Sequence, residues 1–288
     1  MDSVNSSRSD SNAPASLELD LDSAANNLDI VFEQAESLLC DLGEGFSSHV
    51  KKLSTIKSRF GEGRFHLAVL GQFKRGKSSL LNALVGYPLL PTSVIPLTAI
   101  PTFMEYGPEV QIRIIFKNDQ PDQVIKDIPP TEAKSILEKF VTEGAKPKNE
   151  LGVDQVEVSF PAPLLGEGVI LIDTPGIGST FTHNTEATLN FLPQCDAALF
   201  VVSADPPITE VEVQFLKAVK EKIDKLFFIF NKIDYLSESE RDESLSFLKK
   251  TLAEKIGYDG QLIFCVSARN GLEAKIAEDS ELWSKSGV

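Results

Sequence analysis

The chain has 288 residues, of which 42% are apolar and 24% are charged, a balance typical of a soluble globular protein with a full core. Its net charge of −14 repels phosphate backbones and anionic lipid, so we expect no nucleic-acid partner and no membrane binding by charge alone. Scattered cysteines and histidines, with no secretory signal and no long apolar run, predict a cytoplasmic chain with free thiols and no zinc site.

The N-terminal part of the chain falls into two segments. Residues 1–27 are rich in Ser, Asn and Asp and are expected to be disordered. From residue 28 to residue 60, apolar residues recur at three- and four-residue spacing, which predicts a helical segment that Gly43 and Gly45 kink or interrupt. The apolar stripe must pack either on the chain's own domain or in a helical bundle or neck whose other helices lie elsewhere. Residues 61–288 are expected to form the second domain.

From residue 65 onward, short β-branched runs alternate with helical patterns. This alternation predicts an α/β fold with a mainly parallel central sheet, flanked by helices and extended by extra strands. The predicted strands span 65–70, 102–106, 110–116, 155–160, 169–172, 197–202, 226–230 and 262–266. The predicted helices span 78–84, 131–142, 186–192, 210–223 and 239–256. Gly107-Pro108 between the second and third strands indicates that these two form an antiparallel hairpin.

The first chemical signal is a phosphate-binding loop between a predicted strand and a predicted helix. The pattern G-x-x-x-x-G-K-[ST] is matched by Gly71-Gln72-Phe73-Lys74-Arg75-Gly76-Lys77-Ser78-Ser79. Its glycines let successive N–H groups point at an anion, and the following helix adds its positive N-terminal end. Lys77 is expected to reach the β- and γ-phosphates, and the Ser78 hydroxyl is expected to hold Mg²⁺. The chain is therefore predicted to bind a nucleoside triphosphate.

Three further signals each follow a predicted strand, where open α/β sheets bind ligands. They are Asp173-Thr174-Pro175-Gly176, Asn231-Lys232-Ile233-Asp234 and Ser267-Ala268-Arg269. Asp173 is expected to hold Mg²⁺ through water, and the Gly176 N–H is expected to sense the γ-phosphate. Each motif alone is weak, but their order and their positions after strands make the combination specific.

The second and third of these motifs predict a guanine site. The Asp234 carboxylate can accept both the N1–H and the exocyclic amine of guanine, whereas adenine would leave a desolvated carboxylate unpaired. We expect Asn231 to tie its loop to the phosphate loop and the stem of Lys232 to lie over the base. The Ala268 N–H is expected to donate to the guanine carbonyl oxygen.

A long insert separates the phosphate loop from the Asp173 motif. The distance from Lys77 to Asp173 is 96 residues, more than in Ras-like or ribosome-assembly GTPases. The insert includes a proline-punctuated segment at 90–101 that resembles a switch segment. Thr98 is the first candidate for the Mg²⁺ and γ-phosphate contact, and Thr92 is the second.

These residues together resemble a known family. The run from Gly71 to Leu84, the Leu-Pro…Pro-Leu-Thr-Ala-Ile-Pro segment, Asp-Thr-Pro-Gly and Phe-Leu-Pro-Gln-Cys-Asp-Ala-Ala-Leu-Phe-Val-Val at 191–202 resemble the GTPase domain of bacterial dynamin-like proteins. The resemblance covers about residues 60–270. It implies a large GTPase that uses Mg²⁺, converts GTP to GDP and forms a homodimer through its GTPase domain when loaded with nucleotide.

The same resemblance implies coupling to membrane remodelling through a helical stalk. The stalk and any membrane-binding tip would follow Val288, so the chain is expected to be an N-terminal fragment. Lipid contact would then depend on that further part, with the protein in the cytoplasm or peripheral on the inner face of the cell membrane.

The residues expected to drive hydrolysis depart from better-known relatives. Dynamins carry a Gln-Ser pair where Phe73 and Lys74 stand, and Ras-like enzymes use Gln where Ile177 follows Gly176. Thr98 and the Gly176 backbone are therefore left to position the water. Lys74 coincides with the internal arginine finger of guanylate-binding proteins, so Lys74, or as a lesser alternative Arg75, is our candidate for the transition-state cation. A solvated basic pair on the loop rim is the alternative.

Two other functions stay open from the sequence. One is a ribosome- or RNA-associated regulatory GTPase, which the acidic charge and the long insert disfavour. The other is a non-hydrolysing GTP-binding scaffold, because Phe73 and Ile177 replace the usual water-positioning groups. The segment Asp205-Pro206-Pro207 is either a partner contact or, with more support, a simple turn.

Overall fold

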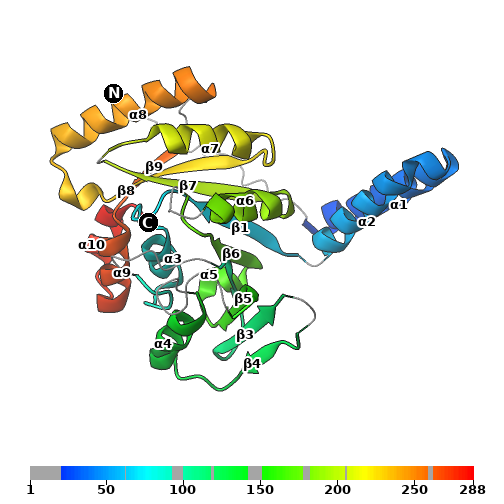
Figure 1. Cartoon of the computed structure of the whole chain (residues 1–288), viewed down its shortest axis with the longest axis horizontal. Coiled ribbons are helices and arrows are strands. Elements are labelled where there is room, and N and C mark those ends of the chain that lie inside the picture. The colour runs from blue at the N-terminus through cyan, green and yellow to red at the C-terminus, as the bar shows by residue number, and fades with distance from the viewer. Residues whose placement is uncertain are drawn as a thin grey trace, which may run out of the picture. The chain divides into compact units, whose positions relative to one another are not determined.

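The computed structural model describes residues 21–61, 63–92, 100–117, 120–141, 151–177, 182–204, 206–258 and 262–288. The chain divides into two compact units, one ending at Gly63 and one running from Arg64 to Val288 (Figure 1). The predicted disorder of residues 1–20 lies outside the described residues.

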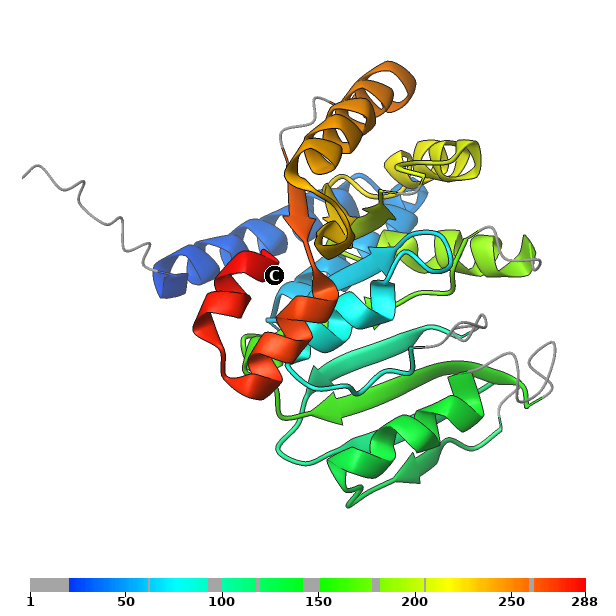
Figure 2. The same cartoon turned by 90° about the vertical axis from the view of Figure 1, so that its left-hand side faces the viewer.

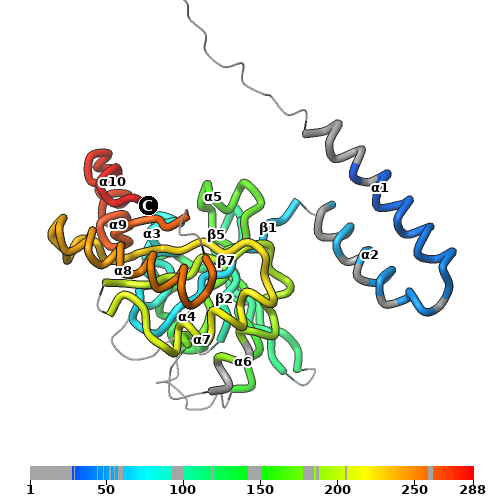
Figure 3. Tube along the Cα trace, turned by 90° about the horizontal axis from the view of Figure 1, so that it is seen from above, coloured from blue at the N-terminus to red at the C-terminus, as the bar shows by residue number. Residues whose placement is uncertain are grey.

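The first unit is a pair of helices joined by a short turn. Its elements are α1 (Leu21–Asp41), η1 (Glu44–Phe46) and α2 (Ser47–Gly61). Figure 3 shows α1 and α2 running back along each other, and Lys57 Nζ lies 3.4 Å from Glu33 Oε1 across the pair. Gly43 adopts a left-handed φ of +92° at the end of α1, so the predicted interruption at the glycines is confirmed.

The start of this helical unit was predicted too late. Helix α1 begins at Leu21, whereas the sequence pattern placed the first helical residue at 28 and the disordered tail before it. Ala24 and Ala25 are strong helix formers, and their propensity outweighs the polar residues around them.

The two helices leave many large apolar side chains uncovered by each other. The apolar residues that are 38% to 65% exposed in this unit are Leu28, Ile30, Val31, Leu38, Leu42, Phe46 and Ile56. A helix pair of this kind cannot bury its whole apolar stripe within itself.

The second unit is built on one sheet. Within the described residues, nine strands follow the order β4-β3-β5-β2-β6-β1-β7-β8-β9. The strands are β1 (Phe65–Leu70), β2 (Thr102–Tyr106), β3 (Gln111–Phe116), β4 (Gln123–Ile125), β5 (Val153–Phe160), β6 (Val169–Asp173), β7 (Ala197–Ser203), β8 (Leu226–Asn231) and β9 (Ile263–Val266). The helices are α3 (Lys77–Val85), α4 (Pro130–Val141), α5 (Pro163–Gly166), α6 (Thr182–Phe191), η2 (Leu192–Gln194), α7 (Glu210–Lys220), η3 (Ile233–Tyr235), α8 (Glu238–Ile256), α9 (Ala268–Ala277) and α10 (Ser280–Ser286).

The sheet has two halves that differ in strand direction. Strands β6, β1, β7, β8 and β9 all run parallel to one another, and we call them the parallel half. The remaining strands, β4, β3, β5 and β2, form the mixed half, in which β2 runs antiparallel to β6 and parallel to β5. The expected mainly parallel α/β sheet extended by extra strands is confirmed.

The side chains of the strands alternate between two apolar layers. In β1, Leu67 and Val69 pack with the layer under α3, α4, α5 and α9. Ala68 and Leu70 face the opposite layer, which α7 and α8 cover. Figure 2 shows helices on both faces of the sheet. Such two-sided burial explains why the strands read as nearly continuous apolar runs.

The predicted hairpin of the second and third strands is wrong. Strand β5 lies between β2 and β3, pairing parallel with β2 and antiparallel with β3. Gly107 does not adopt the positive φ that a tight hairpin turn needs. Instead it crosses the end of β5 so closely that a Cβ there would lie 2.6 Å from the Ser159 Cβ. The strand β4 and the helices α5 and α9 were not predicted as elements.

Candidate functional site

The carboxyl ends of the parallel half meet at one edge of the sheet. Because these strands all run in the same direction, the residues that follow them lie side by side. The residues at these ends are Gly71 after β1, Asp173 on β6, Ser203 on β7, Asn231 on β8 and Ser267 after β9. Four of the five belong to motifs that the sequence predicts as nucleotide loops.

Two glycines let the phosphate loop pass close to neighbouring elements. Gly71 has φ +142°, and a Cβ there would lie 2.5 Å from the Val201 carbonyl oxygen on β7. Gly76 has φ +94°, and a Cβ there would lie 2.4 Å from the Asn231 Nδ2 atom. Any other residue would have to displace these contacts and adopt a left-handed backbone. The loop therefore needs glycine at both positions.

Lys77 lies in the interior of the loop and starts helix α3. Its ammonium donates to the Gly71 carbonyl at 3.0 Å and to the Gln72 carbonyl at 3.4 Å. Burial lowers the pKa of this ammonium, while the carboxylates of Asp173 and Glu212 oppose that shift. A buried cation beside a helix N-terminus is suited to an anionic ligand.

Ser78 and Asp173 lie together at the end of β6. The Ser78 hydroxyl donates to Asp173 Oδ2 at 2.8 Å, and the Asp173 side chain is nearly buried. A hydroxyl and a carboxylate are the oxygen donors that Mg²⁺ accepts. Among the described residues no group of three or more His, Cys, Asp or Glu side chains could hold a metal. This donor pair fits a magnesium ion that also takes oxygen ligands from a nucleotide and water.

The Asp173 loop is docked onto the phosphate loop. Thr174 donates from its hydroxyl to the Val69 carbonyl at 2.7 Å, and the Ile177 N–H donates to the Gly71 carbonyl at 3.3 Å. A Cβ at Gly176 would lie 3.4 Å from the Lys77 ammonium, so glycine lets this backbone approach the cation. Ile177 is 1% exposed in the core, which explains its apolar character where other GTPases carry a polar side chain.

Asn231 ties the β8 loop to the phosphate loop, as predicted. Its Nδ2 donates to the Arg75 carbonyl at 3.0 Å. Its Oδ1 accepts from the N–H groups of Lys232 at 2.8 Å and Ala268 at 3.1 Å. One buried amide therefore joins three loops, and Lys232 beside it adopts a left-handed φ of +67°.

The Asp234 carboxylate is exposed and held by one of its oxygens. The Ser267 hydroxyl donates to Asp234 Oδ1 at 2.7 Å and also caps helix α9 by accepting from the Asn270 N–H. The Ala268 N–H, which we expect to donate to the guanine carbonyl oxygen, donates to Asn231 Oδ1 in the structure. The Arg269 side chain lies along α9 and pairs with Glu273 at 3.0 Å.

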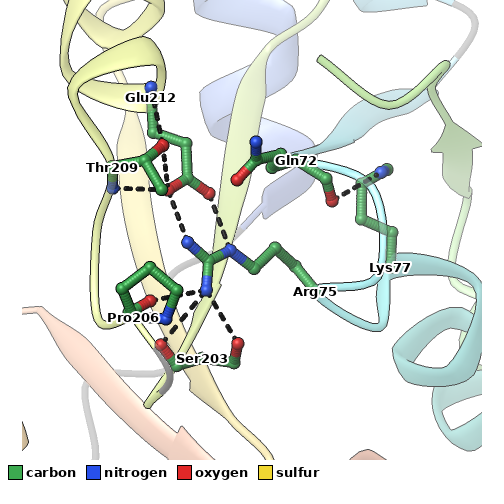
Figure 4. A network of polar contacts seen from close by, with 7 residues as sticks. All are labelled: Gln72, Arg75, Lys77, Ser203, Pro206, Thr209 and Glu212. Carbon is green, nitrogen blue, oxygen red and sulfur yellow. Dashed lines mark hydrogen bonds and ion pairs between the residues drawn. The ribbon is translucent and has the colours of Figure 1, made fainter. Parts of the chain in front are cut away.

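The two basic residues in the middle of the phosphate loop point to different environments. Lys74 is exposed at a left-handed φ of +67°, with its ammonium 5.4 Å from the Phe73 ring centroid. The Arg75 guanidinium is buried and bound by protein groups, as Figure 4 shows. The lesser alternative, that Arg75 supplies a cation to the nucleotide, is therefore wrong for this arrangement. Gln72 and Ser79 are partly buried, at the start of the loop and in the first turn of α3.

Sequence reasoning missed the residues that bind Arg75. They are Ser203 at the end of β7, Pro206 in the connection that follows, and Glu212 in the first turn of α7, which also accepts from Thr209. The pattern Thr209-x-x-Glu212 is a capping box, so the sequence held a signal for the helix start. It held no signal that Glu212 would also face a residue of the phosphate loop.

The predicted switch residue Thr98 lies outside the described residues. Four residues later, Thr102 begins β2 and pairs in register with Asp173. The described chain thus enters the mixed half beside the candidate magnesium ligand. Thr92, the second candidate, is exposed.

The site gathers cations in an acidic chain. Lys232 is half-buried, and its pKa is lowered by burial and by the charges of Arg75 and Lys74, with Asp234 opposing. Such mutual influence indicates that the basic side chains share one region, and clustered cations favour a polyanionic ligand.

Helices long and apolar enough to cross a membrane were sought in the described residues, and none is present there.

A phosphate loop on β1, an acidic residue on β6 and an N-K-x-D loop on β8 of a parallel sheet define a P-loop GTPase fold. The family model of the Dynamin family matches residues 67–233, more than half of the chain. The chain belongs to the dynamin family, which confirms the resemblance seen in the sequence.

Curated relatives agree with this assignment. The chain is 44% identical over 243 residues to an uncharacterized protein in the xynA 3′ region of Caldicellulosiruptor sp. (strain Rt8B.4), covering 84% of this chain and 58% of the relative. It is 35% identical over 199 residues to the bacterial dynamin-like protein of Nostoc punctiforme, covering 66% of this chain and 28% of the relative. The chain thus spans less than two thirds of the length of these relatives.

A solved structure agrees in fold. It is an oligomerised bacterial dynamin pair, described as providing a mechanism for long range sensing and tethering of membranes. Its TM-score with this chain is 0.63 at 20% identity, covering 94% of this chain and 50% of that chain.

Proposed function

We propose that this chain binds and hydrolyses GTP with Mg²⁺, as the GTPase domain of a dynamin-like protein. The observation that carries the proposal is the joining of separate nucleotide loops at one sheet edge. Ser78 donates to Asp173 across 95 residues of sequence, and Asn231 donates to Arg75 across 156. Folding alone does not require that loops so far apart in the sequence carry phosphate-binding and guanine-binding motifs at the same sheet edge.

The geometry supports the following roles for the nucleotide. The N–H groups of residues 71–79 and the Lys77 ammonium would bind the phosphates, with the Gly176 N–H at the γ-phosphate. Asp234 would read guanine, with Lys232 along the base and residues 267–269 closing the other side. Ser267 already holds the Asp234 carboxylate in one orientation, which reduces the cost of ordering it on binding.

Magnesium would be held by Ser78 and Asp173, with Thr98 as a further candidate ligand. The ion would neutralise charge on the transferred phosphoryl group. The Gly176 backbone and Thr98 would orient the attacking water. Lys74, exposed on the loop rim, is the remaining basic candidate of the phosphate loop for the transition-state cation.

The proposal is tested by titrating the chain with GTP, GDP and ATP by calorimetry and by measuring phosphate release. We expect GTP and GDP to bind and ATP to be rejected by at least about 100-fold, because a desolvated carboxylate would stay unpaired. The variant Asp234→Asn should lose this preference. Equal binding of GTP and ATP by the unmodified chain would overturn guanine recognition, and tight GTP binding without turnover would favour the non-hydrolysing scaffold.

The role of Lys74 is tested by turnover of Lys74→Ala at saturating GTP. A fall in kcat with unchanged GTP affinity is expected of a group that acts on the transition state. An unchanged kcat would leave Lys74 as a solvated residue of the loop rim.

We further propose that nucleotide-loaded GTPase domains pair and that the full protein acts on membranes through parts beyond this chain. The solved bacterial dynamin pair, described for sensing and tethering membranes, supports both ideas. Gel filtration with light scattering in GDP and fluoroaluminate should show a dimer, and GDP alone should show a monomer. A monomer in both conditions would contradict the pairing.

A further inference from the structure

Each nitrogen of the Arg75 guanidinium donates to a protein group (Figure 4). Its Nε donates to Glu212 Oε1 at 2.8 Å and its Nη2 donates to Glu212 Oε2 at 2.6 Å. Both side chains are buried, at 4% and 0% exposure. This is the two-pronged arginine–carboxylate pair that fixes direction as well as distance.

The remaining nitrogen of the guanidinium reaches the connection between β7 and α7. The Nη1 atom donates to Ser203 Oγ at 2.9 Å and to the Pro206 carbonyl at 2.6 Å. The Ser203 carbonyl accepts at 3.3 Å. The guanidinium therefore contacts the end of β7, the following connection and helix α7 at the same time.

Glu212 serves two elements with one carboxylate. Its Oε2 accepts from the Thr209 N–H at 2.8 Å and from the Thr209 hydroxyl at 2.9 Å, which caps the first turn of α7. The same oxygen accepts from Arg75. Any displacement of the first turn of α7 therefore moves the partner of the phosphate loop.

The backbone of the same arginine is also held. Its carbonyl accepts from Asn231 Nδ2 at 3.0 Å, beside Gly76. Residue 75 thus connects the phosphate loop with the β8 loop through its backbone and with the β7–α7 connection through its side chain. Of the three loops, only the β7–α7 connection carries no motif for nucleotide binding.

We propose that Arg75 is a positioning residue that holds the phosphate loop in its binding shape from behind, through Glu212, Ser203 and Pro206. The proposal rests on the nucleotide binding proposed above. A buried ion pair contributes little net stability compared with an apolar pair of the same size, but it fixes one arrangement. A phosphate loop held in advance binds phosphate with a smaller loss of entropy.

This role predicts a particular pattern of binding constants. The loop surrounds phosphates that GDP and GTP share, so loosening it should weaken both nucleotides by the same factor. A group acting on the transferred phosphoryl would instead lower kcat, and a group at the γ-phosphate would weaken GTP alone. By reciprocity, bound nucleotide must also stabilise the β7–α7 connection.

The test uses a double variant that carries both Arg75→Met and Glu212→Leu, and compares it with the unmodified chain. This change replaces the buried pair by apolar side chains of similar size and so preserves folding better than a single change that leaves one charge unpaired. We expect the Kd values of GDP and GTP to rise together by about tenfold, with kcat at saturating GTP within about twofold of the unmodified chain.

Two further variants keep the test decisive. Arg113→Met removes an exposed arginine that bonds two carboxylates, Asp122 and Glu157, and should leave both Kd values unchanged. Arg75→Lys keeps the cation but cannot bind Glu212 in the two-pronged way, so both Kd values should rise by a smaller common factor. Arg75→Lys carries the test if the double variant does not fold.

Hydrogen exchange of residues 206–216 provides a readout that a merely structural role would not move. In the unmodified chain GDP should slow exchange there, and in the folded double variant saturating GDP should not. Unchanged Kd values in the folded variants, or a fall in kcat alone, or a weaker Kd for GTP alone, would each overturn the proposal. Failure of the unmodified chain to bind GTP or GDP would overturn the proposed function itself.

Discussion

The parallel and mixed halves of the sheet both contain fully buried strand residues but differ in what their ends carry. Phe200 and Phe228 in the parallel half and Ile112 and Ile114 in the mixed half are all 0% exposed. Yet the phosphate loop, Asp173, Asn231 and Ser267 all follow strands of the parallel half. The mixed half contains strands of both directions, so its strand ends are distributed over both edges.

The comparison shows that strand direction, more than composition, brings polar groups together. Both halves are rich in the same apolar residues, and both are covered by helices. Only strands that run the same way deliver their following loops to the same edge. We therefore expect substitutions in the parallel half's loops to change ligand binding and substitutions in the mixed half's core to change stability alone.

The largest expected effect on binding is that of Lys77→Ala. Loss of the buried ammonium should weaken GTP by about 1000-fold, or about 4 kcal/mol, because the phosphates lose a charge-assisted donor. The melting temperature should change little, since within the described part of the chain Lys77 donates to two loop carbonyls, those of Gly71 and Gln72. Calorimetry and thermal unfolding monitored by circular dichroism measure the two quantities.

Lys275→Ala is the matched control for this change. Lys275 also donates to a backbone carbonyl, that of Leu84 at 2.9 Å, but it lies on α9 away from the nucleotide loops. GTP affinity should be unchanged in this variant. Retained GTP affinity in Lys77→Ala would contradict the assignment of the phosphate loop.

Ile112→Ala should produce the opposite pattern in the mixed half. Ile112 is fully buried on β3, so truncation removes apolar contacts and leaves a cavity worth about 2–5 kcal/mol of unfolding free energy. The Kd of GTP should stay within about twofold, because β5 and β2 separate β3 from the strands that carry the nucleotide loops. Urea unfolding would measure the unfolding free energy. Nucleotide titration at a temperature about 20 °C below the melting temperature of the variant would measure the Kd. A large loss of affinity in the folded variant would mean that the two halves are coupled.

Much of the parallel half could be predicted because its signals are local. Strand β1 has the predicted bounds, and each nucleotide motif directly follows its strand. A motif and its strand are neighbours in the chain, so their pattern survives without knowledge of the rest of the fold. The Asn231 contact with the phosphate loop follows from the same rule once the strands are known to be parallel.

The rest depends on pairings between distant residues. Strand β5 arrives long after β2 and β3 and separates them, which no turn signal at Gly107 could reveal. Arg75 and Glu212 are 137 residues apart, and a capping box explains Glu212 without any reference to Arg75. Local rules predict what a residue does for its own helix, but they do not predict which distant residue also binds its side chain.

Gly76→Ala should affect both binding and stability, because it combines strain with a clash. Its φ of +94° disfavours any side chain, and its Cβ would lie 2.4 Å from Asn231 Nδ2. We expect about 1–3 kcal/mol lower unfolding free energy and about 10- to 100-fold weaker GTP binding. Gly152→Ala in the mixed half has a similar φ of +68° but nothing within 4 Å, so only the strain should remain. Equal effects of the two changes on GTP affinity would contradict the role of the Asn231 contact.

Asp122→Asn should have the smallest effect, because it should change neither GTP binding nor the stability of the fold. Asp122 accepts two hydrogen bonds from Arg113, so this pair also joins an arginine to a carboxylate, as the Arg75–Glu212 pair does. The Arg113 side chain, however, is 46% exposed and that of Arg75 only 4%. Water and salt screen an exposed pair, so many such pairs contribute nothing measurable, whereas a buried pair dictates the arrangement around it. An unchanged urea midpoint and an unchanged Kd for GTP are therefore expected at both low and high salt. A clear change in either would show that burial is not what separates the arginine of the phosphate loop from the arginine of β3.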